Sequence, residues 1–253
     1  MHWREMIHYL HRPKAERDVK ALGGKALRRA VKLHAAKLLA PIFDQPFADE
    51  VFLAGGAFKP LLKRGHLVRD LDLWVRNRKV RERLCAHLIA GGAELVHDFR
   101  PYCIKFSKRN VEIEITYQNV KGSMMEVLAG FDIAACSVAA TYQDGAVTDC
   151  LITARAERSF LEREIFLNEG YIARLEARRS PDVLQSIDRI GQFAEDFDLD
   201  LPTELCERLW GVYENVYTID EREACLGTYL KTTVDYKGRC DLSLLKRASA
   251  VSS

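Results

Sequence analysis

The chain reads VFLAGGAFKP at residues 51–60 and RDLDLWV at residues 69–75, which predicts a strand, a glycine turn with a short helix, and a second strand. Side chains two apart in a strand point to the same face, so Asp70 and Asp72 project together while the leucines beside them turn toward the core. Adjacent carboxylates repel each other unless a cation lies between them, and Mg²⁺ prefers oxygen ligands. The second stretch therefore predicts a strand that carries a divalent metal site.

The glycine pair in the first stretch suits the same chemistry. Gly55 and Gly56 have no side chains, so backbone N–H groups can approach an anion where the short helix begins. Together, the glycines and the carboxylates predict a site for a triphosphate and its metal ions.

A third carboxylate would complete such a site, and residues 111–117 contain two candidates. Glu112 and Glu114 alternate with apolar residues, so both lie on a polar strand face that could oppose Asp70 and Asp72 across the sheet. Ordinary surface glutamates on an exposed edge strand are the alternative. We favour Glu114, which is flanked by two isoleucines, and keep Glu112 as the alternate.

The composition indicates a globular protein. The chain has 253 residues, of which 48% are hydrophobic, so it can form one large domain or two smaller ones. Its net charge is only +2, but residues 1–40 are mainly basic and residues 180–223 mainly acidic. A basic face beside a metal site would suit RNA, although a basic helix is often only a solvated face.

The cysteines and the apolar segments indicate the cellular compartment in which we expect the protein. The seven cysteines are scattered without C-x-x-C spacing, which argues against a disulfide framework and against a zinc site. They are Cys85, Cys103, Cys136, Cys150, Cys206, Cys225 and Cys240. The sequence has neither an apolar leader nor a run long enough to span a membrane, and we therefore expect a reducing cytoplasm.

Hydrophobic periodicity predicts three parts: a basic helical arm at residues 1–44, an α/β head at 45–153 and a helical region at 154–253. The expected fold class is α+β, with a mixed sheet flanked by helices. His34 lies on the apolar stripe of a helix predicted at 14–40, where a hydrogen-bonded core histidine is a better explanation than a ligand. Further predicted elements are a helix at 76–90, strands at 94–97, 102–107 and 111–117, a hairpin at 138–151 turned by Asp144-Gly145, and a helix that opens at Ser180-Pro181.

The motif LAGG at residues 53–56, followed after thirteen residues by DLDL at 70–73, resembles the signature of the polymerase-β-like nucleotidyltransferase superfamily. The glycine pair is most similar to the branch that contains bacterial poly(A) polymerases and CCA-adding tRNA nucleotidyltransferases. The resemblance implies that the two aspartates bind two Mg²⁺ ions and that Glu114 or Glu112 completes the cluster. It also implies that the glycines hold the phosphates of a nucleoside triphosphate (NTP).

The reaction so implied is attack of an acceptor hydroxyl on the α-phosphate of an NTP, with release of pyrophosphate. The basic arm favours an RNA 3′ end, similar to that of tRNA, as the acceptor. Cations near the glycine turn could neutralise the phosphates, and a solvated surface role explains each of them equally well. These cations are Lys59, Lys63, Arg64 and Arg69.

Two alternatives stay open. A protein hydroxyl or a small molecule could be the acceptor, as in relatives of the toxin–antitoxin or antibiotic-modifying type. A catalytically silent domain could bind RNA or a protein through the same surface, although such a domain does not need the repulsion among the carboxylates. CCA addition itself is not favoured, because residues 130–134 read GFDIA where CCA-adding enzymes have a basic pair followed by Asp-Phe-Thr.

Overall fold

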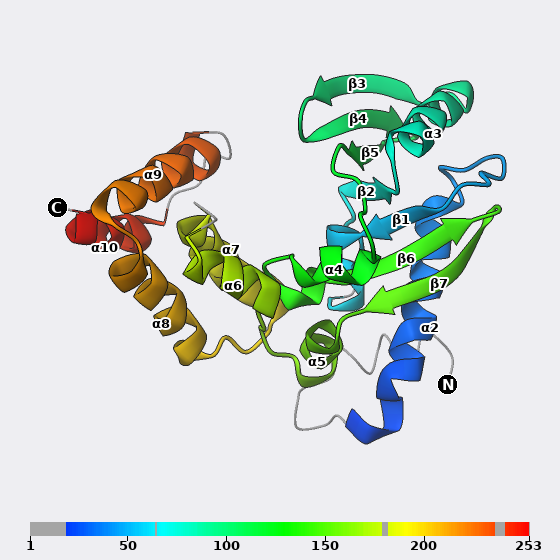
Figure 1. Cartoon of the computed structure of the whole chain (residues 1–253). Helices are drawn as coiled ribbons and strands as arrows, with labels where there is room; N and C mark the ends of the chain where they lie inside the picture. The colour runs from blue at the N-terminus through cyan, green and yellow to red at the C-terminus, as the bar shows by residue number, and fades with distance from the viewer. Residues whose placement is uncertain (1–18, 64, 179–181, 236–240, 253) are drawn as a thin grey trace. The chain divides into compact units, whose positions relative to one another are not determined.

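The computed structural model describes residues 19–63, 65–178, 182–235 and 241–252 (Figure 1). The described chain divides into two compact units. The sheet unit contains the chain up to Ala129 together with Ala134–Glu162, and the helical unit contains Gly130–Ile133 together with the chain from Arg163 onward. The division into three parts at residues 44 and 153 stays a prediction about which segments fold independently.

The sheet unit contains a seven-stranded sheet with the order β3-β4-β5-β2-β1-β6-β7. Its strands are β1 (Val51–Ala54), β2 (Asp70–Val75), β3 (Glu94–Phe99), β4 (Cys103–Lys108), β5 (Val111–Thr116), β6 (Val138–Gln143) and β7 (Ala146–Ile152). Strands β2 and β5 pair in parallel, whereas β1 pairs antiparallel with both β2 and β6. The pairs β3–β4, β4–β5 and β6–β7 are antiparallel neighbours. This mixed sheet confirms the predicted α+β class.

Helices surround this sheet. They are α2 (Val19–Leu39), the 3₁₀ helix η2 (Gly55–Leu61), α3 (Arg78–Ala90), α4 (Met124–Ala129), a 3₁₀ turn at Ala134–Cys136 and α5 (Ala154–Glu162). Helix α2 packs against β6, β7 and η2 through Leu27, Val31 and Ala35, which are buried, and Figure 1 shows it beside the β6–β7 hairpin. Helix α3 begins two residues later than predicted, because the Asn77 side chain accepts a hydrogen bond from the backbone N–H of Val80 and caps the helix.

Period-two burial fixes which face of the central strands meets the core. On β2, Leu71 and Leu73 are fully buried, and on β5 Ile113 and Ile115 are fully buried in the same way. The residues between them are half-buried or exposed. The carboxylates of β2 and β5 therefore lie on the face opposite to these buried side chains.

The helical unit contains α6 (Glu169–Glu176), α7 (Val183–Phe197), α8 (Thr203–Gly211), α9 (Ile219–Tyr229) and α10 (Leu242–Ser252), with π-helical turns at Val212–Val216 and Leu230–Asp235. Its core includes Leu184, Ile190 and Phe197 of α7. The predicted helix start at Ser180-Pro181 lies outside the described residues. Across the described part of the chain, every helix is too short or too polar to span a lipid bilayer.

Six of the cysteines lie in the described segments, and all six are free thiols. Cys136, Cys150 and Cys225 are buried, and the other three are half-buried. Cys240 lies outside the described residues.

Candidate functional site

Strands β2 and β5 bring the four predicted carboxylates onto one face of the sheet. In their parallel register, Asp70 lies beside Glu112 and Asp72 lies beside Glu114. Register partners in a ladder share a face, so all four side chains project from the side opposite to the buried leucines and isoleucines. The sequence predicts this shared face from alternation, and the register adds which carboxylates are neighbours.

Strand β4 adds a cation that the sequence analysis missed. Lys105 lies directly opposite Glu114 in the antiparallel β4–β5 ladder. Its Nζ is 2.8 Å from Glu114 Oε1 and 3.0 Å from Glu112 Oε2. The hydrogen bond to Glu114 is the main reason why the pKa of Lys105 is raised. Alternation along residues 102–107 could have placed Lys105 on a strand face, but not opposite a particular glutamate.

The second oxygen of Glu114 also has a partner on β4. The Cys103 thiol donates to Glu114 Oε2 at 3.6 Å. Burial raises the pKa of Cys103 to about 11, and the negative charges of Glu114 and Asp72 act in the same direction. Cys103 and Lys105 thus contact the two oxygens of Glu114 from the same strand.

The carboxylates fit Mg²⁺ in part. Carboxylate oxygen is the donor that Mg²⁺ prefers, and Asp70 and Asp72 offer it from adjacent positions on one strand face. Glu112 and Glu114 instead pair with Lys105, and the described segments contain no group of three or more His, Cys, Asp or Glu side chains arranged to hold a metal ion. The ligand roles expected for all four carboxylates stay predictions.

The glycine turn begins beside β2, the strand that carries Asp70 and Asp72. Strand β1 ends at Ala54, which is the register partner of Asp72, and Gly55 follows with a φ of +77°. This left-handed backbone favours glycine, because a Cβ atom there would be strained. The following helix η2 is a 3₁₀ helix of seven residues, so an anion would be bound by close backbone approach more than by a helix dipole.

A lysine folds back over this turn. A Cβ atom built on Gly56 would lie 3.6 Å from Cε and 3.7 Å from Nζ of Lys59. The ammonium group and the turn therefore form one small basic surface beside β2. Of the other predicted cations, Lys63 and Arg69 are exposed and Arg64 lies outside the described residues.

Helix α2 packs against η2, the helix that follows the glycine turn. His34 donates from Nε2 to the backbone oxygen of Ala57 at 2.8 Å, and its ring lies 6.1 Å from the ring of the fully buried Phe58. Burial lowers the pKa of His34 below its ordinary value. This confirms the interpretation of His34 as a hydrogen-bonded packing residue.

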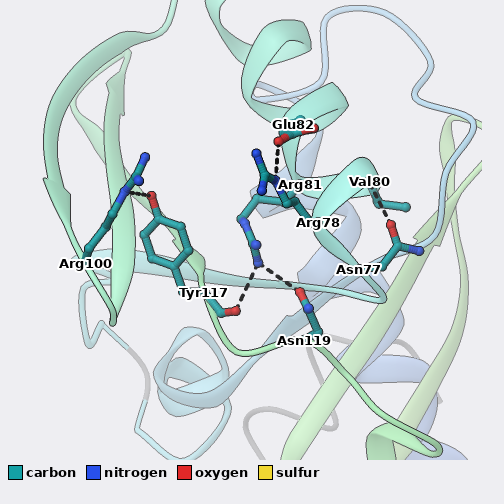
Figure 2. A network of polar contacts seen from close by, with 8 residues as sticks. All are labelled: Asn77, Arg78, Val80, Arg81, Glu82, Arg100, Tyr117 and Asn119. Carbon is teal, nitrogen blue, oxygen red and sulfur yellow. Dashed lines mark hydrogen bonds and ion pairs between the residues drawn. The ribbon is translucent and has the colours of Figure 1, made fainter.

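A buried arginine fixes the end of β5 to helix α3 (Figure 2). Arg81, only 7% exposed, donates from Nη1 to the backbone oxygen of Tyr117 at 3.0 Å and to Asn119 Oδ1 at 2.9 Å. Its guanidinium also lies 4.8 Å from the centre of the Tyr117 ring. The Tyr117 hydroxyl donates to Asp98 Oδ1 at 2.7 Å. These contacts hold the strand that carries both glutamates.

The helical unit contains a separate polar cavity of about 250 Å³, lined in part by Asp132, Arg174 and Arg189. Asp132 Oδ2 accepts a hydrogen bond from Arg189 at 2.9 Å, and Oδ1 accepts from the backbone N–H of Ile133 at 2.8 Å. Both oxygens of Asp132 thus have partners within this unit.

The mixed sheet with its glycine turn beside β2 also occurs in solved structures of other proteins. A solved CCA-adding enzyme in complex with CTP has this fold, with a TM-score of 0.53 and 16% identity over 93% of this chain and 53% of that protein. The Thermotoga maritima CCA-adding enzyme complexed with tRNA has a TM-score of 0.50 and 16% identity, over 93% and 54%. A tRNA-processing enzyme in an apo form has a TM-score of 0.50 and 15% identity, over 89% and 62%.

These likenesses show the fold, and they confirm the fold that the resemblance predicts. The chain spans less than two thirds of the length of the solved proteins that it matches. Comparison of the sequence with models of known protein families and with curated proteins gave no match.

Proposed function

We propose that this protein is a metal-dependent nucleotidyltransferase, which transfers a nucleoside monophosphate from an NTP to an acceptor hydroxyl. The observation that carries the proposal is the register of the central strands, where the glycine turn begins next to the partner of Asp72 and where Asp70 and Asp72 share one face. The common fold with a CCA-adding enzyme that was solved with CTP supports an NTP as substrate.

Each group near the turn has a role in this proposal. Asp70 and Asp72 would hold Mg²⁺, which supplies charge stabilisation at the transferred phosphate. Gly55 and Gly56 let the backbone approach the triphosphate, while Lys59 and Arg69 neutralise it. The acceptor oxygen forms a bond to the α-phosphorus, and the bond from that phosphorus to the bridging oxygen breaks. Pyrophosphate leaves with the electron pair, and the hydroxyl proton passes to solvent.

An RNA 3′ end is the proposed acceptor. The Thermotoga maritima enzyme with the same fold was solved with tRNA. On α2, Lys25 and Arg29 are exposed, and cations of this kind attract a phosphate backbone. A protein or small-molecule hydroxyl is the second candidate, because the GFDIA stretch departs from CCA-adding enzymes and leaves the acceptor less constrained than the nucleotide chemistry.

A labelling assay tests the proposal. Purified protein with Mg²⁺ and each of four α-labelled NTPs is incubated with total RNA and, separately, with a protein extract. We expect labelled RNA, and a loss of at least about 100-fold in Asp70→Asn and in Asp72→Asn, since removal of a group that stabilises transition-state charge costs about 10²–10³ in rate. Glu82→Gln, at an exposed carboxylate of α3, is the matched control and should keep full activity.

The other outcomes separate the alternatives. Labelling that survives both aspartate substitutions contradicts the proposed site. Labelled protein or small molecules with unlabelled RNA would select the second acceptor class. RNA binding that needs neither NTP nor Mg²⁺, without any labelled product, would identify a silent binding domain.

A further inference from the structure

We infer that Lys105 is a positioning residue that withholds Glu112 and Glu114 from the metal site, so that Asp70 and Asp72 alone bind the divalent ion. The inference rests on the proposed function, because it concerns the same metal. It replaces the expectation of a third carboxylate ligand with a role for a residue of the chain's own β4 strand.

The first support is that the carboxylate of Glu114 is engaged at both oxygens. Lys105 Nζ lies 2.8 Å from Oε1, and the Cys103 thiol donates to Oε2 at 3.6 Å. Both partners come from β4, on the side of β5 opposite to β2. The carboxylate of Glu114 is therefore bound toward β4, although its backbone position is next to Asp72.

The second support is charge. One ammonium group serves two glutamates, since Lys105 Nζ also lies 3.0 Å from Glu112 Oε2. The side chains of Lys105 and Glu114 are only 21% and 22% exposed, so solvent screens their attraction less than that of a surface pair. Lys105 thus neutralises part of a four-carboxylate face and makes the neutralised part a poorer ligand for a cation.

The third support is that other contacts of β4 fix the position of Lys105. Three residues further along the strand, the buried Lys108 donates to the backbone oxygen of Ile42 at 2.9 Å and to Asp44 Oδ2 at 2.6 Å. The β4–β5 register runs without interruption from Cys103 to Lys108, which is the partner of Val111. Lys105 is held opposite Glu114 by the ladder itself, so the ion pair is part of the fold.

The test measures binding of Mn²⁺ alone, by the free-ion signal in electron paramagnetic resonance, with no nucleotide present. We expect Lys105→Met to bind Mn²⁺ at least about tenfold more tightly, because loss of the ammonium group releases a carboxylate beside Asp72, and tenfold corresponds to about 1.4 kcal/mol. Lys105→Arg keeps the cation and should bind Mn²⁺ as the unsubstituted protein does. Thermal denaturation establishes that each variant is folded, and Lys105→Gln is the second uncharged variant.

The two glutamates provide matched controls. In the unsubstituted protein, Glu114→Gln and Glu112→Gln should have equal and small effects on Mn²⁺ affinity, since each removes one charge and neither removes a ligand. In the Lys105→Met background, Glu114→Gln should abolish the gain and Glu112→Gln should leave most of it, because Glu114 is the register partner of Asp72. A merely structural role of Lys105 would not produce this difference.

Two failures are distinguishable. Unchanged or weaker Mn²⁺ binding in folded Lys105→Met and Lys105→Gln overturns the inference, as does a loss in Glu114→Gln as large as that in Asp72→Asn. Mn²⁺ binding that survives both Asp70→Asn and Asp72→Asn overturns the metal site of the proposed function instead.

Discussion

At the scale of single residues, the two glycines of the turn have different reasons to be glycine. Gly55 has a φ of +77°, so its backbone excludes a side chain on conformational grounds. Gly56 has ordinary room for a Cβ atom, with its nearest neighbour, Lys59 Cε, at 3.6 Å. The fold therefore explains Gly55, whereas it leaves room for a side chain at Gly56, where the proposed function places a phosphate.

This contrast gives a prediction. Gly55→Ala should lower the free energy of unfolding by about 1–2 kcal/mol, the cost of a left-handed residue with a side chain. Gly56→Ala should change stability by less than about 0.5 kcal/mol and weaken NTP binding instead, because its methyl group enters the space proposed for the phosphates. Urea denaturation and binding of a fluorescent NTP measure the two effects. Full NTP affinity in Gly56→Ala would contradict the proposal that the phosphates bind at this turn.

At the scale of elements, helix α3 carries two arginines that should contribute very different amounts to the free energy of unfolding (Figure 2). Arg81 is buried and binds the end of β5, whereas Arg78 forms an exposed pair with Glu82 one turn away, with side chains 81% and 59% exposed. We expect Arg81→Met to lower the free energy of unfolding by about 1–3 kcal/mol, since it leaves carbonyl groups without a donor. Arg78→Met should cost less than about 0.5 kcal/mol. Equal losses in urea denaturation would contradict this assignment.

The contact between α2 and η2 predicts a dependence of stability on pH. Burial lowers the pKa of His34 in the folded protein, so the unfolded chain binds more protons at acidic pH. Its contribution to stability is complete above the ordinary pKa of 6.5 and declines as pH falls from there toward the lowered value. His34→Gln can still donate to Ala57, and it should make the free energy of unfolding depend less on pH between about 5 and 7. The same slope in both proteins would show that other groups dominate.

At the scale of the whole molecule, local patterns predicted the elements and not their pairing. Alternation in 69–75 and 111–117 identified β2 and β5, because burial on one face leaves a period of two in the sequence. Strand order has no such local signal. Asp72 and Glu114 are neighbours only because β5 enters the sheet beside β2 in parallel, which depends on packing of the whole unit.

Lys105 and Arg81 show why the remaining site residues were missed. The position of Lys105 opposite Glu114 depends on the β4–β5 register, which is set by a turn where Arg109 and Asn110 have φ values of 52° and 64°. A slip of one residue would move Lys105 to the other face of the sheet. Arg81 belongs to a basic run in the sequence, and only its burial and its contacts with Tyr117 and Asn119 distinguish it from the exposed cations beside it.

The parallel pairing of β2 with β5 also bears on how the chain acquires its site during folding. Strands β3, β4 and β5 follow one another closely and can pair through short connections, whereas Asp70 and Glu112 are about forty residues apart and meet only after a large loop has closed. The contact between the aspartates and the glutamates is therefore non-local, and we expect it to form after the hairpins. A chain with only the local hairpins formed would contain every one of these carboxylates, but their shared face exists only once β2 pairs with β5.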